Sequence, residues 1–126
     1  MDNTVAKLRE LTKVVAGDIL KTSIEYKTTN GTAIGFGLFA DENVAIQRVF
    51  FSAGTKFSNH IHDNADEYCI LVSGCLIFSL NGKETKITRG GVFIVNPLIQ
   101  HSAHAIEDTW AIFVSIPPVV GYPGTM

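Results

Sequence analysis

Short apolar runs separated by turn residues make up most of the chain after residue 18. Within these runs β-branched and aromatic residues are frequent, and most runs alternate apolar and polar positions with the two-residue period of a β-strand. The pattern predicts ten strands, at 19–28, 33–39, 44–51, 55–62, 67–72, 75–80, 83–88, 92–95, 101–106 and 110–116. Because no crossover helix separates them, we expect an all-β fold, either a closed antiparallel barrel or a double-sheet jelly roll.

The start of the chain follows a helical pattern instead. Val5, Leu8 and Leu11 recur at helical spacing, Thr4 can cap the segment and Gly17 can close it. The sequence therefore predicts one short N-terminal helix before the strands.

Two runs depart from the alternation. Residues 68–72 and 75–78 are apolar at every position, so both faces of these strands should be buried. One face can line the barrel, but the other needs a cover, either the N-terminal segment or a second subunit. We expect a homodimer formed through this sheet.

Length and composition limit the classes of function. The 126 residues, 13.7 kDa, suit a single domain over 1–126 with one core. With 46% hydrophobic residues, 17% charged residues and a net charge of −2, the chain should fold and should not bind nucleic acid through its phosphates. The partner we expect is instead a small-molecule substrate.

The lengths of the apolar runs and the number of cysteines indicate where in the cell the protein is located. No apolar run approaches the roughly 20 residues needed to span a bilayer, and the first residues do not resemble a signal peptide. Cys69 and Cys75 are too few for a disulfide scaffold and are not spaced as a zinc knuckle. We expect free thiols, with Cys69 packed in the core, no membrane partner and a cytoplasmic location.

Three histidines and one glutamate have a spacing with chemical meaning. His60 and His62 are two residues apart on a predicted strand, so they leave the same face about 6.6 Å apart. The turn at 63–66 should place Glu67 on the next strand, opposite His62, and barrel closure can bring His101 to the same point. Three imidazoles and one carboxylate suit a divalent first-row metal with open positions for substrate.

The residues around this constellation resemble the first motif of the cupin family. Its fixed positions are matched by Gly54, His60, His62, Glu67 and Gly74, within residues 54–74. The second motif, within 90–105, is matched by three residues: Gly90 (or Gly91), Pro97 and His101. The glycine usual between proline and histidine is here Leu98 or Ile99, and the usual asparagine is Ala105. The resemblance covers about residues 44–116.

Strand parity separates the two histidines of the later strand. If His101 points inward, Ala103 and Ala105 do too, and His104 points outward and is not a ligand. By the same parity Lys56 shares the face of His60 and His62, at the rim of the barrel. Gln47 or Arg48 can enter the pocket, depending on the register of their strand.

The resemblance implies Fe(II), Mn(II), Ni(II), Co(II) or Zn(II) on His60, His62, Glu67 and His101. It implies a substrate that chelates the ion, and Glu67 released from the metal as a catalytic base. Our first hypothesis is a metal-dependent, dioxygenase-type enzyme. Lyase or isomerase chemistry at the same site, a non-catalytic barrel that binds or senses a small molecule, and an unmetallated barrel with polar residues at its mouth remain open.

Overall fold

The fold is built of β-strands, as the sequence predicts. The computed structural model describes residues 23–60 and 64–118, apart from the side chains of Ser23, Ser58, Asn59 and His60. Its strands are β1 (Ser23–Tyr26), β2 (Ala33–Ala40), β3 (Ala45–Phe51), β4 (Lys56–His60), β5 (Asp66–Ser73), β6 (Cys75–Leu80), β7 (Lys83–Thr88), β8 (Val92–Val95), β9 (His101–Ala105) and β10 (Thr109–Ile116). Each of the ten predicted strands is confirmed, and ends that fall within the described residues differ by at most a few positions. Residues 19–22 of the first predicted strand and 61–62 of the fourth lie outside the described residues. The predicted N-terminal helix lies outside the described residues, and nothing within them forms a helix able to cross a membrane.

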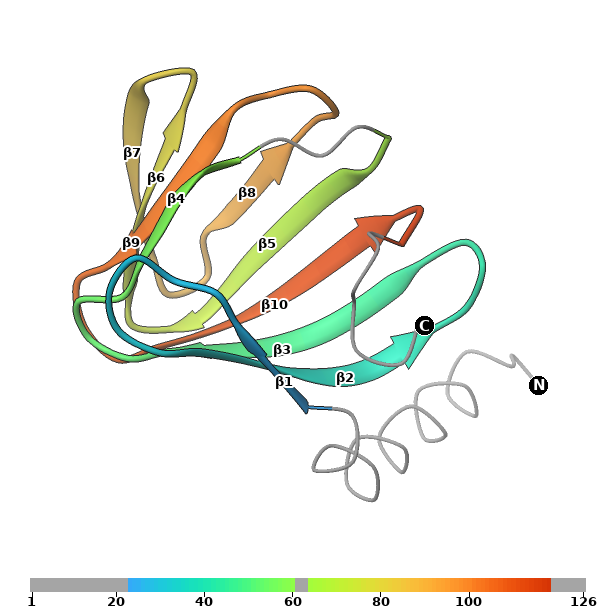
Figure 1. The fold of residues 1–126 in the computed structure, drawn as a ribbon, viewed down its shortest axis with the longest axis horizontal. Helices are drawn as coiled ribbons and strands as arrows, with labels where there is room; N and C mark the ends of the chain where they lie inside the picture. Colours follow the sequence, from blue (N-terminus) through green and yellow to red (C-terminus); the bar gives the residue numbers. More distant parts are fainter. Residues whose placement is uncertain (1–22, 61–63, 119–126) are drawn as a thin grey trace.

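The strands form two antiparallel sheets that face each other (Figure 1). One sheet has six strands in the order β1-β2-β3-β10-β5-β8, and the other has four in the order β4-β9-β6-β7. Strands that are consecutive in sequence often lie in different sheets, as β3 and β4 or β4 and β5 do. This arrangement confirms the double-sheet jelly roll rather than a barrel of sequential hairpins.

Alternation along each strand decides which side chains enter the space between the sheets. On β10, Thr109, Ala111, Phe113 and Ser115 are buried, whereas the residues between them are only half-buried. Because β10 lies between β3 and β5, it is held by backbone hydrogen bonds on both sides. Its register therefore fixes the inward faces of both neighbours.

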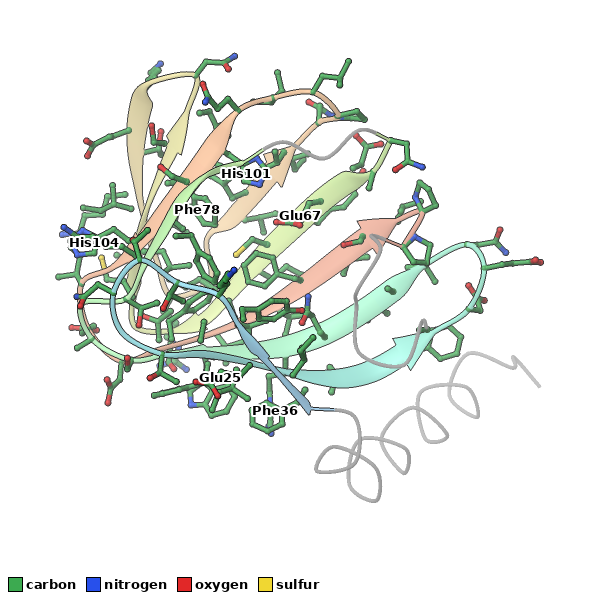
Figure 2. All side chains as sticks on the ribbon, viewed as in Figure 1. Glu25, Phe36, Glu67, Phe78, His101 and His104 are labelled. Carbon is green, nitrogen blue, oxygen red and sulfur yellow. The ribbon has the colours of Figure 1, made fainter. Side chains whose placement is uncertain are left out.

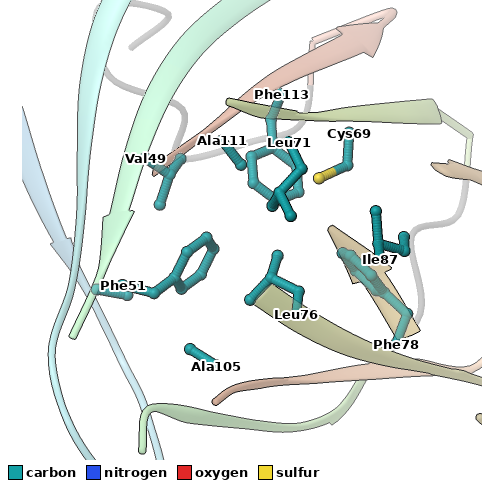
Figure 3. Packing of buried hydrophobic residues seen from close by; sticks show 11 residues of the cluster. Val49, Phe51, Cys69, Leu71, Leu76, Phe78, Ile87, Ala105, Ala111 and Phe113 are labelled. Carbon is teal, nitrogen blue, oxygen red and sulfur yellow. The ribbon is translucent and has the colours of Figure 1, made fainter. Parts of the chain in front are cut away.

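The hydrophobic core fills the space between the two sheets (Figure 3). Leu71 from β5 and Leu76 from β6 are 1% and 0% exposed and meet from opposite sheets. Phe78 of β6 stacks on Phe93 of β8, with ring centroids 4.4 Å apart, so aromatic contact also joins the sheets. Cys69 is buried in this core, as expected for a small apolar side chain.

The hairpin between β6 and β7 shows the expected turn chemistry. Leu80 pairs with Lys83, leaving Asn81 and Gly82 as the two-residue loop. Both loop residues have positive φ, 48° and 85°, as a type I′ turn requires. Asn-Gly is the dipeptide that such a turn prefers, so the conformation of the loop follows from its own two residues.

Among the described residues, apolar side chains of β5 and β8 are exposed on the outer face of the six-stranded sheet. On β5, Cys69 and Leu71 are buried, but Ile70 and Val72 are 40% and 46% exposed. The sequence led us to expect residues 68–72 and 75–78 to lie in one sheet with both faces buried. They lie on β5 and β6, which belong to different sheets, and on β5 only the inner face is buried within the described part of one chain. Ile94 of the neighbouring strand β8 is 48% exposed as well.

Candidate metal centre

His60 and His101 are brought together by strand pairing. His60 is the last residue of β4, His101 is the first of β9, and the two are register partners in the four-stranded sheet. About forty residues separate His60 from His101 in the sequence, so strand pairing brings them together. The fold therefore places two of the predicted ligands at adjacent backbone positions.

His101 is buried and oriented by its own loop. Its side chain is 2% exposed, and its Nδ1 lies 2.9 Å from the carbonyl oxygen of Ile99. Because a carbonyl oxygen can only accept, Nδ1 carries the proton in the neutral ring and Nε2 holds the lone pair. Metal-binding histidines usually donate their second nitrogen to such a carbonyl or carboxylate. The ring is thus in the tautomer that a metal ligand needs.

Glu67 approaches from the opposite sheet. It lies on β5, where its register partners are Ser115 of β10 and Val95 of β8, and it is half-buried. Figure 2 shows Glu67 and His101 both directed into the space between the sheets. The sequence led us to expect Glu67 on a strand paired with that of His62. That pairing is wrong, because β4 and β5 belong to different sheets.

The parity expected for β4 is also corrected. The register shifts between Phe57 and His60, so Lys56 pairs with His104 and Phe57 with Ala103. Phe57 packs against the core and Lys56 is exposed. A β-bulge adds one residue to a strand and exchanges its faces, so Lys56 does not share the face expected from simple alternation. His104 lies on the outer side, as predicted, and its register partner Lys56 lies there too. Ala103 and Ala105 face the core, also as predicted.

The complete ligand set stays a prediction. His62 and the side chain of His60 lie outside what the structure describes, and the described side chains alone contain no group of three or more His, Cys, Asp or Glu able to hold a metal ion. The residues in view nevertheless fit a cation. A fixed imidazole and a carboxylate face the same interior from two sheets, and a third candidate is paired to the first.

A polar pair that the sequence did not single out lies on the inner face of the large sheet. The Tyr26 hydroxyl on β1 donates to Oε1 of Gln47 on β3, 2.5 Å away. The register thus selects Gln47 for the interior, whereas Arg48 points outward and stacks over Trp110 at 4.7 Å. No sequence signal could have paired Tyr26 with Gln47, because their contact depends on how β1, β2 and β3 align.

Burial raises the pKa of Tyr26 to about 12, and the negative charge of Glu67 adds to this shift. The folded state therefore binds the Tyr26 hydroxyl proton more strongly than the unfolded state does. The contribution of this difference to the free energy of unfolding is fully present below pH 10 and is lost as the pH rises toward 12. We expect a loss of roughly 2 kcal/mol over this interval. Urea unfolding from pH 9 to 12 should show it for the wild type and for Tyr68→Phe, but not for Tyr26→Phe.

Burial, and to a smaller extent the charge of Glu67, also raises the pKa of the Cys69 thiol above its usual range. Cys69 and Tyr26 lie on different strands of the large sheet and both respond to the same carboxylate.

The loop before His101 shows how this chain replaces a motif glycine. Leu98 has φ +67° and is 67% exposed. This left-handed conformation is one that glycine adopts freely and other residues adopt at a cost of about 1–2 kcal/mol. Of the two positions considered from the sequence, Leu98 and Ile99, the structure thus assigns the glycine-like conformation to Leu98.

Leu98→Gly should stabilise the protein by about 0.5–1 kcal/mol, because relief of the left-handed strain exceeds the added entropy of the unfolded chain. Ile99→Gly is the matched control. Ile99 does not have a positive φ and is half-buried, so this change should destabilise. Urea unfolding measures both, and a loss of stability in Leu98→Gly would contradict the interpretation.

Comparison with known proteins agrees with this fold. Residues 47–117, more than half of the chain, match the cupin domain family. Among solved structures, KdgF from a Halomonas species is 20% identical, with 75% of this chain and 89% of that chain covered and a TM-score of 0.68. A predicted oxalate decarboxylase from Thermotoga maritima is 19% identical, with 77% and 93% covered and a TM-score of 0.68. The cupin domain of Cnp3 from Schizosaccharomyces pombe is 18% identical, with 74% and 69% covered and a TM-score of 0.66. At such identities the likeness concerns the fold alone, and a search of the curated proteins found no match.

Proposed function

The chain belongs to the cupin family, and from this premise we propose that it is a metal-dependent enzyme, of dioxygenase type, acting on a small organic substrate. The observation that carries the proposal is His101, a buried imidazole whose Nδ1 is engaged by the Ile99 carbonyl at 2.9 Å. This hydrogen bond leaves the lone pair on Nε2, and the ring faces the same interior as the Glu67 carboxylate, as a metal ligand requires.

The ligands in this proposal are His60, His62, Glu67 and His101. Three neutral imidazoles and one carboxylate form a donor set for divalent first-row metals, and availability in the cell rather than the ligand set selects among Fe, Mn, Ni, Co and Zn. A cation held there would supply open coordination positions and polarise the oxygens of a chelating substrate. The described residues support this set through the β4–β9 register and through Glu67 on the facing sheet.

The chain's own residues would then orient the substrate and move its proton. Glu67 is half-buried and presents a carboxylate at the inner face, where it can accept a proton from a substrate carbon or hydroxyl. Val95, its partner on β8, is 2% exposed and helps to keep water from this side of the site. The same residues would serve a lyase or an isomerase, so the oxygen dependence of the reaction has to be measured.

The proposal is tested with protein purified without added metal. Elemental analysis should find about one first-row transition metal ion per chain, and an oxygen electrode should detect metal-dependent oxygen uptake with acetylacetone, catechol or cysteine as substrate. Glu67→Gln should lose turnover and retain less metal, whereas Glu84→Gln, at an exposed position of β7, should change neither.

Full activity and unchanged metal content in Glu67→Gln would exclude the proposed role of this carboxylate. Substrate that binds, raises the melting temperature and is recovered unaltered would instead indicate a binding or sensing barrel.

We also propose that the functional unit is a homodimer joined through the outer face of the six-stranded sheet. Apolar side chains of β5 and β8 are 40–60% exposed there, and patches of this kind mark interaction sites. Glu25 and Arg48 lie on the same face with opposite charge, which allows a two-fold partner to place one against the other. Arg48 has a buried Nε without a hydrogen-bond partner among the described residues, and a partner carboxylate would satisfy it.

Sedimentation velocity at micromolar concentration tests the dimer. The wild type should sediment as a dimer, Ile70→Glu as a monomer, and Thr85→Glu on the exposed face of β7 as the wild type. A monomeric wild type would contradict the proposal.

A further inference from the structure

The interior of the fold has two polar ends with an apolar stretch between them. At one end are Glu67 and His101, and at the other the Tyr26 hydroxyl is held by Gln47. Across the large sheet, Gln47 is followed in register by Phe113 and Cys69, both of which are buried and apolar. A molecule that reaches from one end to the other would therefore need oxygen-bearing groups at both ends and an apolar body.

The backbone makes room for the polar pair. A Cβ at Gly35 would lie 2.4 Å from Oε1 of Gln47 and 2.7 Å from Cε2 of Tyr26. Any side chain at this inward position of β2 would displace the pair from the inner face. Tyr26 is further held by edge-to-face contact with Phe57 of the other sheet, with centroids 6.4 Å apart. The pair is thus packed into a fixed position.

The hydrogen bond determines which atoms of the pair remain available. Because Oε1 of Gln47 accepts from the tyrosine, the amide nitrogen presents its two N–H donors elsewhere. This nitrogen forms no hydrogen bond with any residue that the structure describes. Gln47 is only half-buried, so an acceptor atom of a bound molecule can reach these donors.

We propose that Gln47, positioned by Tyr26, is a specificity-determining residue that donates a hydrogen bond to the end of the substrate remote from the metal. This inference rests on the function proposed above. It narrows the substrate class to small molecules with a chelating oxygen pair at one end, a flat or apolar body, and a carbonyl or other oxygen acceptor at the other end.

The test uses two matched probes and zinc-loaded protein, so that no redox turnover interferes. The probes are 4-ethylcatechol and 3,4-dihydroxyacetophenone, which have the same catechol end and differ in a single remote carbonyl. Titration calorimetry without oxygen gives the ratio of their dissociation constants. Replacing Gln47 with leucine, or with glutamate, which keeps the acceptor for Tyr26 but loses the N–H donors, should reduce the preference for the ketone by about fivefold to tenfold.

The controls separate the possible failures. Tyr26→Phe should weaken the preference in part, because it releases Gln47, while Tyr68→Phe on the outer face of β5 should leave it unchanged. An unchanged ratio in Gln47→Leu, with both catechols still bound, would overturn this inference and leave the metal site intact. Absence of zinc-dependent binding by either probe in the wild type would overturn the proposed function, and this inference with it.

Discussion

Replacing His101 with glutamine should lower metal affinity by about a hundredfold or more, since even partners that only orient a ligand are worth about 10–100-fold. Glutamine fills a similar volume but offers no imidazole nitrogen. The matched change, His104→Gln, should leave metal content unaltered, because His104 faces outward beside Lys56. Both histidines lie on β9 only three residues apart, so the pair tests the orientation of the strand as well as the site.

Metal content is measured by elemental analysis after dialysis, together with the melting temperature of each metal-free protein. The second measurement is needed because His101 is 2% exposed, and a buried substitution can lower stability independently of metal. Retention of one equivalent of metal by a folded His101→Gln protein would exclude His101 as a ligand. Loss of metal from His104→Gln would instead identify His104 as a metal ligand and contradict its outward orientation.

Gly74→Ala should destabilise the protein by about 3 kcal/mol, which would lower the melting temperature by roughly 10 °C. Gly74 has φ +95°, and an added Cβ would lie 2.3 Å from Oγ1 of Thr109 and 2.6 Å from the carbonyl oxygen of Asp108. Thr109 cannot yield easily, because it is fully buried and its hydroxyl accepts from the Cys75 amide at 3.0 Å. The strain of the positive φ and the backbone clash therefore add.

Gly54→Ala provides the comparison. Gly54 is the other glycine of the first motif and also has a positive φ, 84°, but a Cβ there would meet only Nδ2 of Asn30 at 3.7 Å. Only the conformational strain remains, so we expect a loss of about 1–2 kcal/mol. Equal losses in the two variants, by thermal or urea unfolding, would show that the close approach at Gly74 relaxes without cost.

The strands could be predicted from the sequence because their alternation and turn residues are local. The Asn81-Gly82 loop carries its own conformation, and the spacing of His60, His62 and Glu67 identifies a candidate site before any pairing is known. Pairing itself is not local. A two-residue period does not show that β4 and β5 lie in different sheets.

Two further features required the structure. The register shift between Phe57 and His60 exchanges the faces of β4, and no residue between them announces a bulge. The Tyr26–Gln47 hydrogen bond joins strands separated by β2, so it depends on the alignment of three strands. Local sequence gives the residue types of the site, and tertiary alignment decides which of them meet.

The candidate ligands come from both sheets: His60 and His101 from the four-stranded one and Glu67 from the six-stranded one. A cation bound by all of them would act as a cross-link between the two layers, much as a disulfide joins distant segments. Loss of the ion would release this link between the layers. The sandwich should consequently open more readily without metal, and the backbone amides of β5 and β9 should exchange with deuterium faster in the metal-free protein than in the metal-loaded one.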